Sequence, residues 1–458
     1  MGELTRWLRQ APFLPRGRAS GRASVSEPPR PDRLGLVLSG GGSRSSFQVG
    51  ALRYLYDVVG ITPQVITGTS AGSILASVLA QHGDHEGQRA RLADLERIWL
   101  GMTTSSDMFT EYPWFTRLRE HMPTWRKVLA FRQRHDQAET HGAGWRPSTA
   151  WEAAATLWEA GRSRADLQLI VSGPTRERAA FTPGPIVGRL LDPEVFDPAR
   201  LATSPVTLRV AIVALESGEL RYVTNRGTIT DRENQPLPEL GRVPNDEAMR
   251  ASCAIPGVFP PVPLAGEYYV DGGVRENLPV QIMLDHLDVT ACYAVVASPS
   301  GVSPLTSFAT ADMFDIIMRS TSRIMPDELQ RDEVAFARER GVVVIEPTVD
   351  VHDLVTIDPG LIAIAVDYGY LRARDVVTGA TPERSRLTDE IISARRLAWE
   401  AEEARFAEDA AADVEAVKTR LRDLLAQVPA GELPPDADSW WQNWERHTFE
   451  IDQVLALP

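Results

Sequence analysis

Short apolar runs recur from residue 34 to about residue 345 and alternate with segments whose apolar residues follow the spacing of an amphipathic helix. Helices are predicted after residue 46, where Phe47, Ala51, Leu55 and Val58 share a face, and again near residues 73–80 and 246–252. The predicted strands are residues 34–38, 63–67, 207–214, 220–223, 268–270, 290–296 and 342–345. This alternation predicts an α/β fold, a three-layer sandwich with a mostly parallel central sheet.

The pattern changes after Pro382, where a segment rich in Ala, Glu, Arg and Leu runs to Leu425 without a glycine or a further proline. Two apolar stripes recur there at helical spacing, namely Leu387, Ile391, Ala394 and Ala398, then Val414, Val417, Leu421 and Leu424. We therefore expect a helical extension over residues 381–458 that packs on the α/β domain or pairs with a partner, which makes an oligomer one expectation. Near its end lie Trp440, Trp441, Trp444 and Phe449, which we expect to dock on the core, with lipid contact as the alternative.

The other domain boundaries follow from composition. Residues 1–33 hold seven arginines against three acidic residues and are rich in Pro, Gly and Ser. This stretch is expected to be a flexible basic tail, or an arm that binds anionic lipid head groups. Residues 34–300 form the main domain with an insert at about 82–180, and residues 301–380 continue the α/β domain.

The expected insert is irregular in pattern and rich in aromatic residues. Its aromatic residues are Trp99, Trp114, Phe115, Trp125, Phe131, Trp145, Trp151 and Trp158. They belong either to an ordinary helical core or to an apolar roof that contacts acyl chains. The histidines in the same stretch match no metal-site spacing, so no metal is expected.

Charge and composition exclude several classes of protein. The chain has 458 residues and a net charge of −14, which argues against general nucleic-acid binding. Cys253 and Cys292 cannot form a disulfide framework, and no apolar run is long enough to cross a membrane. We expect a cytoplasmic protein, with peripheral membrane contact left open by the basic tail.

A glycine-rich segment, Ser39–Ser45, joins the first predicted strand to the first helix. Backbone N–H groups in such a loop bind anions, so a dinucleotide site, an oxyanion hole and a plain tight turn all compete. The nucleotide interpretation lacks the P-loop lysine, has Ser45 in place of the last glycine, and finds Asp57 inside the helical pattern. The oxyanion interpretation gains from a candidate nucleophile one strand–helix unit later.

That candidate is Ser70 in Gly68-Thr69-Ser70-Ala71-Gly72, a G-x-S-x-G pattern between a β-prone run and an apolar helix. Small flanking residues let the backbone reverse sharply, which lifts the serine hydroxyl out at the end of the sheet. The helix that follows directs its positive end at the turn. The alternative is a glycine-rich turn without chemistry.

A serine hydroxyl needs a base to accept its proton, and histidine is the usual one. His286 and His352 lie in stretches without glycine support. Asp271 instead ends a predicted strand and is followed by two glycines, which would hold its carboxylate at the sheet end where Ser70 lies. A carboxylate whose pKa is raised by burial can act as a general base, whereas a plain Asp-Gly turn is the alternative.

In combination, these motifs resemble those of the patatin-like phospholipase family. The resemblance covers about residues 34–300 and rests on Gly40 to Arg44, Gly68 to Gly72, Ala251 to Pro261, and Asp271-Gly272-Gly273 with Asn277 and Pro279. It implies a patatin-like fold and a hydrolase that acts on phospholipids, lysophospholipids or neutral glycerides without a metal or another cofactor.

The resemblance also implies roles for single residues. Ser70 would be the acylated nucleophile and Asp271 its general base, in a dyad without histidine. Gly41 and Gly42 would donate N–H groups to the oxyanion, with Gly40 beside them and Arg44 fixing the loop. Residues that support the two turns would be Gly68, Ala71, Gly72, Gly272 and Gly273. The family usually has glycine where Ser45 stands, and we expect the small serine to preserve the helix entry.

Two other functions stay open at this point. One is a lipid-binding or scaffold protein on a hydrolase fold that has lost its activity, which the basic tail and the terminal tryptophans favour. The other is nucleotide binding at Gly40–Ser45. The partner we expect is a phospholipid or another acyl lipid.

Overall fold

The computed structural model describes residues 33–118, 172–173, 175–302, 304, 307–308, 316, 319–406, 414–429, 431–434, 437 and 440. The chain divides into two compact units. The first holds the described residues up to 108, residues 185–254, and those from 262 onward, and the second is built from residues 109–184 and 255–261. Several segments discussed above lie outside the described residues. They are residues 1–32 of the expected tail, the aromatic residues from 125 to 158, and Trp441, Trp444 and Phe449.

Strands form a large sheet in the first unit and a small one in the second. Those of the first unit are β1 Leu34–Leu38, β2 Val65–Gly68, β5 Thr207–Ala214, β6 Leu220–Thr224, β7 Ile229–Thr230, β8 Val262–Leu264, β9 Glu267–Asp271, β10 Ala291–Val295 and β11 Val343–Ile345. Those of the second unit are β3 Phe109–Glu111 and β4 Phe181–Pro183.

Helices make up most of the remaining first unit. They are α2 Ser45–Tyr54, α3 Ala71–Leu79, α4 His85–Leu100, α5 Ser105–Met108, α9 Pro185–Leu190, α10 Pro198–Thr203, α11 Asn245–Ser252, α12 Val280–His286, α14 Met325–Glu339, α15 Pro359–Thr378, α16 Pro382–Phe406 and α17 Val414–Leu425. None of the helices that the structure describes is long and apolar enough to cross a membrane.

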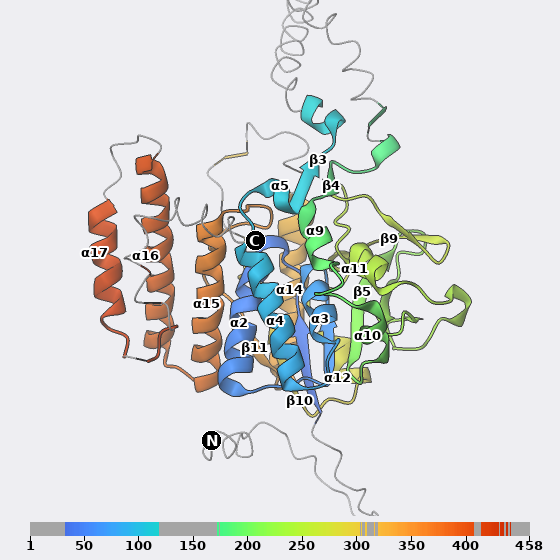
Figure 1. Ribbon diagram of the computed structural model, residues 1–458, viewed down its shortest axis with the longest axis horizontal. Coiled ribbons are helices and arrows are strands. Elements are labelled where there is room, and N and C mark those ends of the chain that lie inside the picture. Colours follow the sequence, from blue (N-terminus) through green and yellow to red (C-terminus); the bar gives the residue numbers. More distant parts are fainter. Residues whose placement is uncertain are drawn as a thin grey trace, which may run out of the picture. The chain divides into compact units, whose positions relative to one another are not determined.

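The large sheet is parallel at its centre and antiparallel at one side. Strands β11, β10, β1, β2 and β5 lie in this order and run parallel, and β6 and β7 follow through antiparallel pairing. Figure 1 labels β11, β10 and β5 of this sheet. Because the carboxyl ends of parallel strands meet at one edge, the loops after β1 and β2 emerge side by side. The predicted glycine-rich segment and the predicted serine turn are those two loops.

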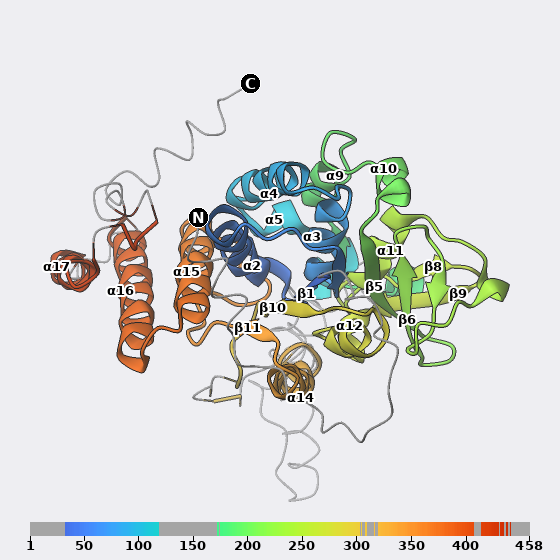
Figure 2. The same ribbon diagram turned by 90° about the horizontal axis from the view of Figure 1, so that it is seen from below.

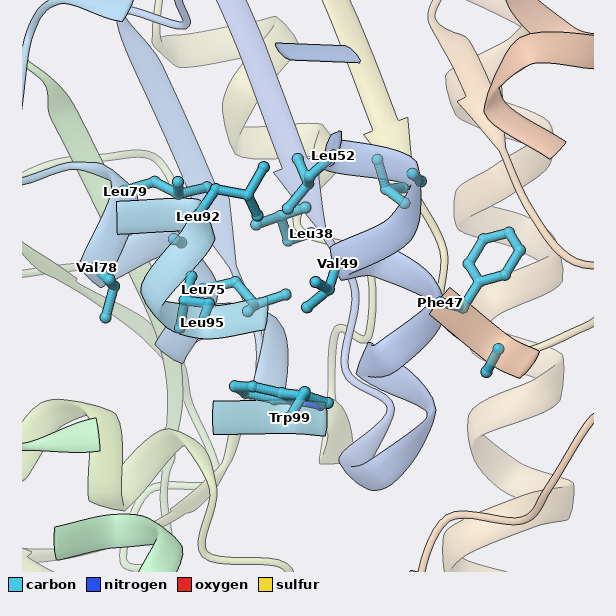
Figure 3. Packing of buried hydrophobic residues seen from close by; sticks show 14 of the residues in the cluster. Leu38, Phe47, Val49, Leu52, Leu75, Val78, Leu79, Leu92, Leu95 and Trp99 are labelled. Carbon is cyan, nitrogen blue, oxygen red and sulfur yellow. The ribbon is translucent and has the colours of Figure 1, made fainter. Parts of the chain in front are cut away.

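Apolar layers cover both faces of this sheet. Leu36, Leu38 and Ile66 belong to one buried cluster, whereas their strand neighbours Val37 and Val65 belong to another. Since successive strand residues point to opposite faces, the two clusters lie on opposite sides. Helices α2, α3 and α4 cover one side and α12 and α14 the other (Figure 2), and side chains of the first three helices gather around Leu38 (Figure 3). The three-layer sandwich predicted from the sequence is confirmed.

Helices α2 and α15 pack backbone to backbone on the first side. A Cβ added to Gly50 would lie 1.7 Å from the carbonyl oxygen of Val366, and one added to Gly369 would lie 1.9 Å from that of Phe47. Only glycine permits such an approach. It fixes α15 directly against the helix that follows the glycine-rich segment.

The C-terminal helices extend this side of the unit, with α16 beside α15 and α17 beside α16 (Figure 1). The predicted apolar stripes are largely buried, as Ile391 and Leu421 show. Between α15 and α16 the buried guanidinium of Arg395 pairs with Asp367 and lies 4.0 Å from the ring centroid of Trp440, which is buried. Losing one partner would leave a buried charge, so this pair favours one arrangement of the helices.

The aromatic residues of the expected insert are core residues wherever the structure describes them. Trp99 is fully buried on α4 in the first unit. In the second unit, Phe115 and Phe109 pack edge to face on Phe181, at centroid distances of 5.2 and 5.0 Å, and Trp114 is buried beside Phe115. For these residues the core interpretation is right, and the apolar roof is not observed.

Helix α4 is the main departure from the sequence pattern, which predicts little regular structure over residues 82–165. The helix begins where the Asp84 carboxylate accepts the amide of Gly87 at 2.8 Å, as an N-cap does. Its buried residues Leu92, Leu95 and Trp99 are flanked by many charged residues. These charged residues interrupt the apolar stripe by which a helix is recognised in a sequence.

Candidate active site

Strands β2 and β9 meet end to end along one edge of β5. β2 pairs with the first half of β5 up to Val210, and β9 pairs with the second half from Ile212. β6 pairs with both halves, so it takes the opposite edge and leaves β9 on the side of β2. β2 therefore ends at Gly68, opposite Val210, while β9 runs the other way and ends at Asp271, opposite Ile212. The turn after β2 and the end of β9 converge at this junction.

Ser70 occupies the sharp turn between β2 and α3. Its φ of 53° and ψ of −130° lie in a region that residues with a side chain rarely adopt. The flanking glycines make this turn feasible. A Cβ on Gly68 would lie 2.5 Å from the carbonyl oxygen of Gly72, and one on Gly72 would lie 2.4 Å from that of Ser39. Strain held at a serine by its surroundings is typical of a functional turn rather than of a plain connection.

Helix α3 starts directly after Ser70 and directs its positive end at the turn. Both the amide and the hydroxyl of Ser73 donate to the carbonyl oxygen of Ser70, at 2.8 and 2.6 Å. The amide of Ala71 has no acceptor in the described part of the chain, which leaves it available to an anion at the turn.

Asp271 is the buried acid at the junction, and only 4% of its surface is exposed. Its Oδ1 accepts the amide of Gly273 at 2.8 Å. Burial raises the pKa of Asp271 to about 7, although the nearby side chain of Ser70 and the amide of Gly273 act to lower it. The Gly272 backbone presses on β5, since a Cβ there would lie 2.6 Å from the carbonyl oxygen of Ala211. A carboxylate with a pKa near neutrality can accept a proton from a serine.

The glycine-rich segment packs directly on this pair, because a Cβ on Gly40 would lie 3.2 Å from the Cβ of Ser70. Three of its amides are engaged: Gly40 donates to Asn277 at 3.0 Å, Ser43 to Leu354 at 3.1 Å and Arg44 to Gly41 at 3.1 Å. Among the described residues, no acceptor binds the amides of Gly41 and Gly42. The geometry therefore suits Gly41 and Gly42 as oxyanion donors. Gly40 cannot itself donate to an oxyanion, because its amide is bonded to the carbonyl oxygen of Asn277.

Arg44 anchors the glycine-rich segment, and its side chain is buried. Its Nε donates to the carbonyl oxygen of His352 at 2.8 Å, and its guanidinium binds the Asp350 carboxylate at 2.6 Å. The same carboxylate oxygen binds Arg323 at 3.0 Å. Arg44 thus fixes the loop, through partners that the sequence pattern does not indicate.

The His352 ring also contacts this segment without reaching the serine turn. Nδ1 lies 3.4 Å from the hydroxyl of Ser43, and Nε2 lies 3.2 Å from that of Ser46. Burial lowers the pKa of His352, so the ring is neutral near pH 7. The histidine supports the loop, and no described contact makes it the base for Ser70.

A pair of buried acids supports the segment that follows the second turn. The Glu333 carboxylate accepts the amides of Asn277 and Leu278, at 3.0 and 2.7 Å, and Glu276 accepts the hydroxyl of Tyr222. Burial raises the pKa of Glu276 to about 7. Burial and the nearby charge of Glu276 raise the pKa of Glu333 well above its usual range. The pair therefore carries fewer than two charges near neutral pH, which limits repulsion beneath the site.

Metal ligands do not gather in the part of the chain that the structure describes. No three His, Cys, Asp or Glu side chains there could hold one ion together.

A family model and a curated protein match parts of the chain. The model of the patatin-like phospholipases matches residues 36–284, which is more than half of the chain. A stretch of 54 residues is 46% identical to triacylglycerol lipase 4 of Saccharomyces cerevisiae. That match covers 12% of this chain and only 6% of the yeast protein.

Solved structures give weaker matches over longer stretches. VipD from Legionella pneumophila is 17% identical, with a TM-score of 0.33 over 93% of this chain and 86% of VipD. Human GIVD cytosolic phospholipase A2 is 12% identical, with a TM-score of 0.28 over 64% of this chain and 48% of the enzyme. At these values the likeness carries no conclusion about activity.

The close approach at Gly72 predicts that a single methyl group disrupts the site. In Gly72→Ala the new Cβ would meet two backbone oxygens, those of Ser39 and Leu38, which cannot move aside as a side chain can. We expect at least a tenfold loss in kcat on a short acyl ester and a lower thermal midpoint, since overpacking costs about 1–3 kcal/mol. Gly188→Ala on α9 is the matched control, because nothing lies within 4 Å of its added Cβ. Equal kcat in the two variants would contradict this account of the turn.

The raised pKa of Asp271 predicts a stability cost that depends on pH. Because the pKa of Asp271 is about 7 in the folded protein and 3.8 is the ordinary value for an aspartate, burial favours the protonated form. The associated stability is full below pH 3.8 and is lost as the pH rises to about 7. Asp271→Asn, which stays neutral, should therefore be the more stable protein at pH 8, by at most about 4 kcal/mol.

Thermal midpoints of both proteins between pH 4 and pH 8 test this prediction. The difference should grow from pH 4 to pH 7 and then level off. A difference that stays constant across this range would mean that Asp271 is not a buried, titrating acid.

Proposed function

The chain belongs to the patatin-like phospholipase family, a family of lipid acyl hydrolases, and on this premise we propose that it cleaves acyl esters of phospholipids or lysophospholipids with a Ser70–Asp271 dyad. The observation that carries the proposal is the junction of β2 and β9 on β5. It joins a strained serine to a buried carboxylate whose pKa is about 7.

The proposed first half-reaction forms an acyl-enzyme. The Oγ of Ser70 attacks the ester carbonyl carbon while Asp271 accepts the hydroxyl proton. The carbonyl oxygen becomes an oxyanion, which the amides of Gly41 and Gly42 stabilise, assisted by the N-terminal end of α3. Collapse of this intermediate expels the alcohol, which takes its proton from Asp271, and leaves the acyl group on Ser70.

The second half-reaction hydrolyses that acyl-enzyme. Water loses a proton to Asp271 and attacks the acyl carbon, and the oxyanion forms again at the same donors. Collapse returns the proton to Ser70 and releases a fatty acid. Each proton that Asp271 accepts is given back within the same half-reaction, so the dyad ends unchanged.

Single residues of the glycine-rich segment have separate roles in this proposal. Arg44 holds the loop by its bonds to Asp350 and to the carbonyl of His352. Gly40 orients the loop against Ser70 by donating its amide to Asn277. In this proposal the two unengaged amides, those of Gly41 and Gly42, donate to the oxyanion.

The domains that we propose are those expected from the sequence. Residues 34–300 form the acyl hydrolase domain with its insert, residues 301–380 continue it, and residues 381–458 are the helical extension. Lipid is the proposed partner, and contact with a membrane surface would be peripheral. Neutral glycerides are the second candidate substrate class, because the yeast relative is named a triacylglycerol lipase.

Product analysis with matched lipids tests the proposal. Purified protein would be incubated with vesicles of phosphatidylcholine, with lysophosphatidylcholine and with emulsified triacylglycerol, and free fatty acid would be measured by mass spectrometry. We expect release from the phospholipids, and at least about a 10³-fold loss in Ser70→Ala.

The control variant is Ser77→Ala on the same helix. Ser77 is also buried, and its hydroxyl has no partner in the described part of the chain. Release by the wild type from triacylglycerol alone would shift the substrate class to neutral glycerides. Activity near the wild-type level in Ser70→Ala would refute the dyad.

A further inference from the structure

The C-terminal end of α11 contacts both members of the dyad. The Oγ of Ser252 accepts the amide of Ser70 at 3.0 Å, and the carbonyl oxygen of Ala254 accepts the amide of Asp271 at 3.0 Å. These acceptors are only two residues apart in the chain. We propose that Ser252–Ala254 is the element that positions the dyad and that the Ser252 hydroxyl is its decisive group, an inference that rests on the proposed roles of Ser70 and Asp271.

The amide of Ser70 needs an acceptor from outside its own turn. At the N-cap of α3 it has no intrahelical partner, and Ser70 lies beyond Gly68, the last residue of β2. The serine is buried, and so is Ser252, which has no exposed surface. An amide buried without an acceptor is costly, so the Ser252 hydroxyl stabilises the strained conformation of Ser70 rather than a relaxed one.

The Ala254 carbonyl has the matching role for the base. The Asp271 amide lies at the last residue of β9, where the ladder with β5 ends. Its bond to Ala254 fixes the backbone from which the carboxylate projects. With both dyad backbones tied to one short segment, the separation of nucleophile and base depends on α11 as well as on the sheet.

The segment itself is rigid enough for this role. The amides of Cys253 and Ala254 close the helix by donating to Met249 and Ala251, both at 3.1 Å. On the core side Ala248 and Ala251 are fully buried. Movement of the helix end would therefore require the layer against β5 to repack.

Cys253 lies between the two acceptors in the sequence. Burial together with the charge of Asp271 raises the pKa of its thiol, whereas the side chains of Ser73 and Ser70 act to lower it. The thiol is therefore neutral near pH 7 and adds no charge beside Asp271.

The inference predicts a change in kcat without a change in KM for Ser252→Ala. Removing the hydroxyl leaves the Ser70 amide without its acceptor and lets the nucleophile leave its position. We expect kcat on a short acyl ester to fall by about 10- to 100-fold, because small misplacements of a reacting group cost this much. KM should stay within about threefold, since the Ser252 side chain has no exposed surface with which a substrate could make contact.

Two companion variants separate positioning from folding. Ser252→Thr keeps the acceptor, so we expect its kcat to stay within about threefold of the wild type even where the extra methyl group lowers the thermal midpoint. Ser77→Ala removes a buried hydroxyl that has no partner among the described residues, so we expect wild-type kcat. A structural role alone would move the thermal midpoint in Ser252→Ala and leave kcat unchanged.

The outcomes distinguish this inference from the proposed function. If Ser70→Ala is inactive while Ser252→Ala keeps wild-type kcat, the inference is overturned and the dyad stands. If Ser252→Thr loses as much kcat as Ser252→Ala, the hydroxyl is not the decisive group, and the inference is again overturned. If Ser70→Ala itself stays active, the proposed function fails, and the inference fails with it.

Discussion

The candidate site depends on one constraint of sheet geometry, which is that β2 and β9 share an edge of β5. Since β6 occupies the other edge, β9 can pair only beyond the point where β2 ends, and because β9 is antiparallel to β5 the two strands run toward each other. Ser70 and Asp271 are far apart in sequence, but their position at this junction requires only that both strands keep register. The glycine-rich segment joins them because β1 lies on the other side of β2.

A second constraint is the burial of ionisable groups around this junction. Burial raises the pKa of both Asp271 and Glu276 to about 7. Asp271 can therefore act as a base, and Glu276 is only partly ionised near neutral pH. Each such group reduces stability when it ionises in the folded protein. The site therefore has a stability cost, which close packing such as that of α2 on α15 offsets.

Local features of the sequence were sufficient for most strands of the large sheet and for the proposal of Ser70 and Asp271 as site residues. β1 and the second half of β5 are continuous apolar runs, and Ser70 and Asp271 are both followed by small residues that mark tight turns. The sequence places Ser252 in the motif Ala251 to Pro261, but it could not indicate the contacts of Ser252, Asp350 or His352, because each contact joins remote segments. The antiparallel direction of β9 was also not predictable, since a short apolar run is the same in either direction. α4 was missed because its charged residues dilute its apolar stripe.

Labelling with a fluorophosphonate tests the central claim most directly, because the reagent reacts only with an activated serine. Wild-type protein and Asp271→Asn would be exposed for equal times, and the modified residue would be found by intact mass and peptide mapping. The account predicts one adduct, on Ser70, and little or none in Asp271→Asn over the same time. An adduct on a different residue, or equal labelling of Ser70 in both proteins, would contradict a dyad in which Asp271 activates Ser70.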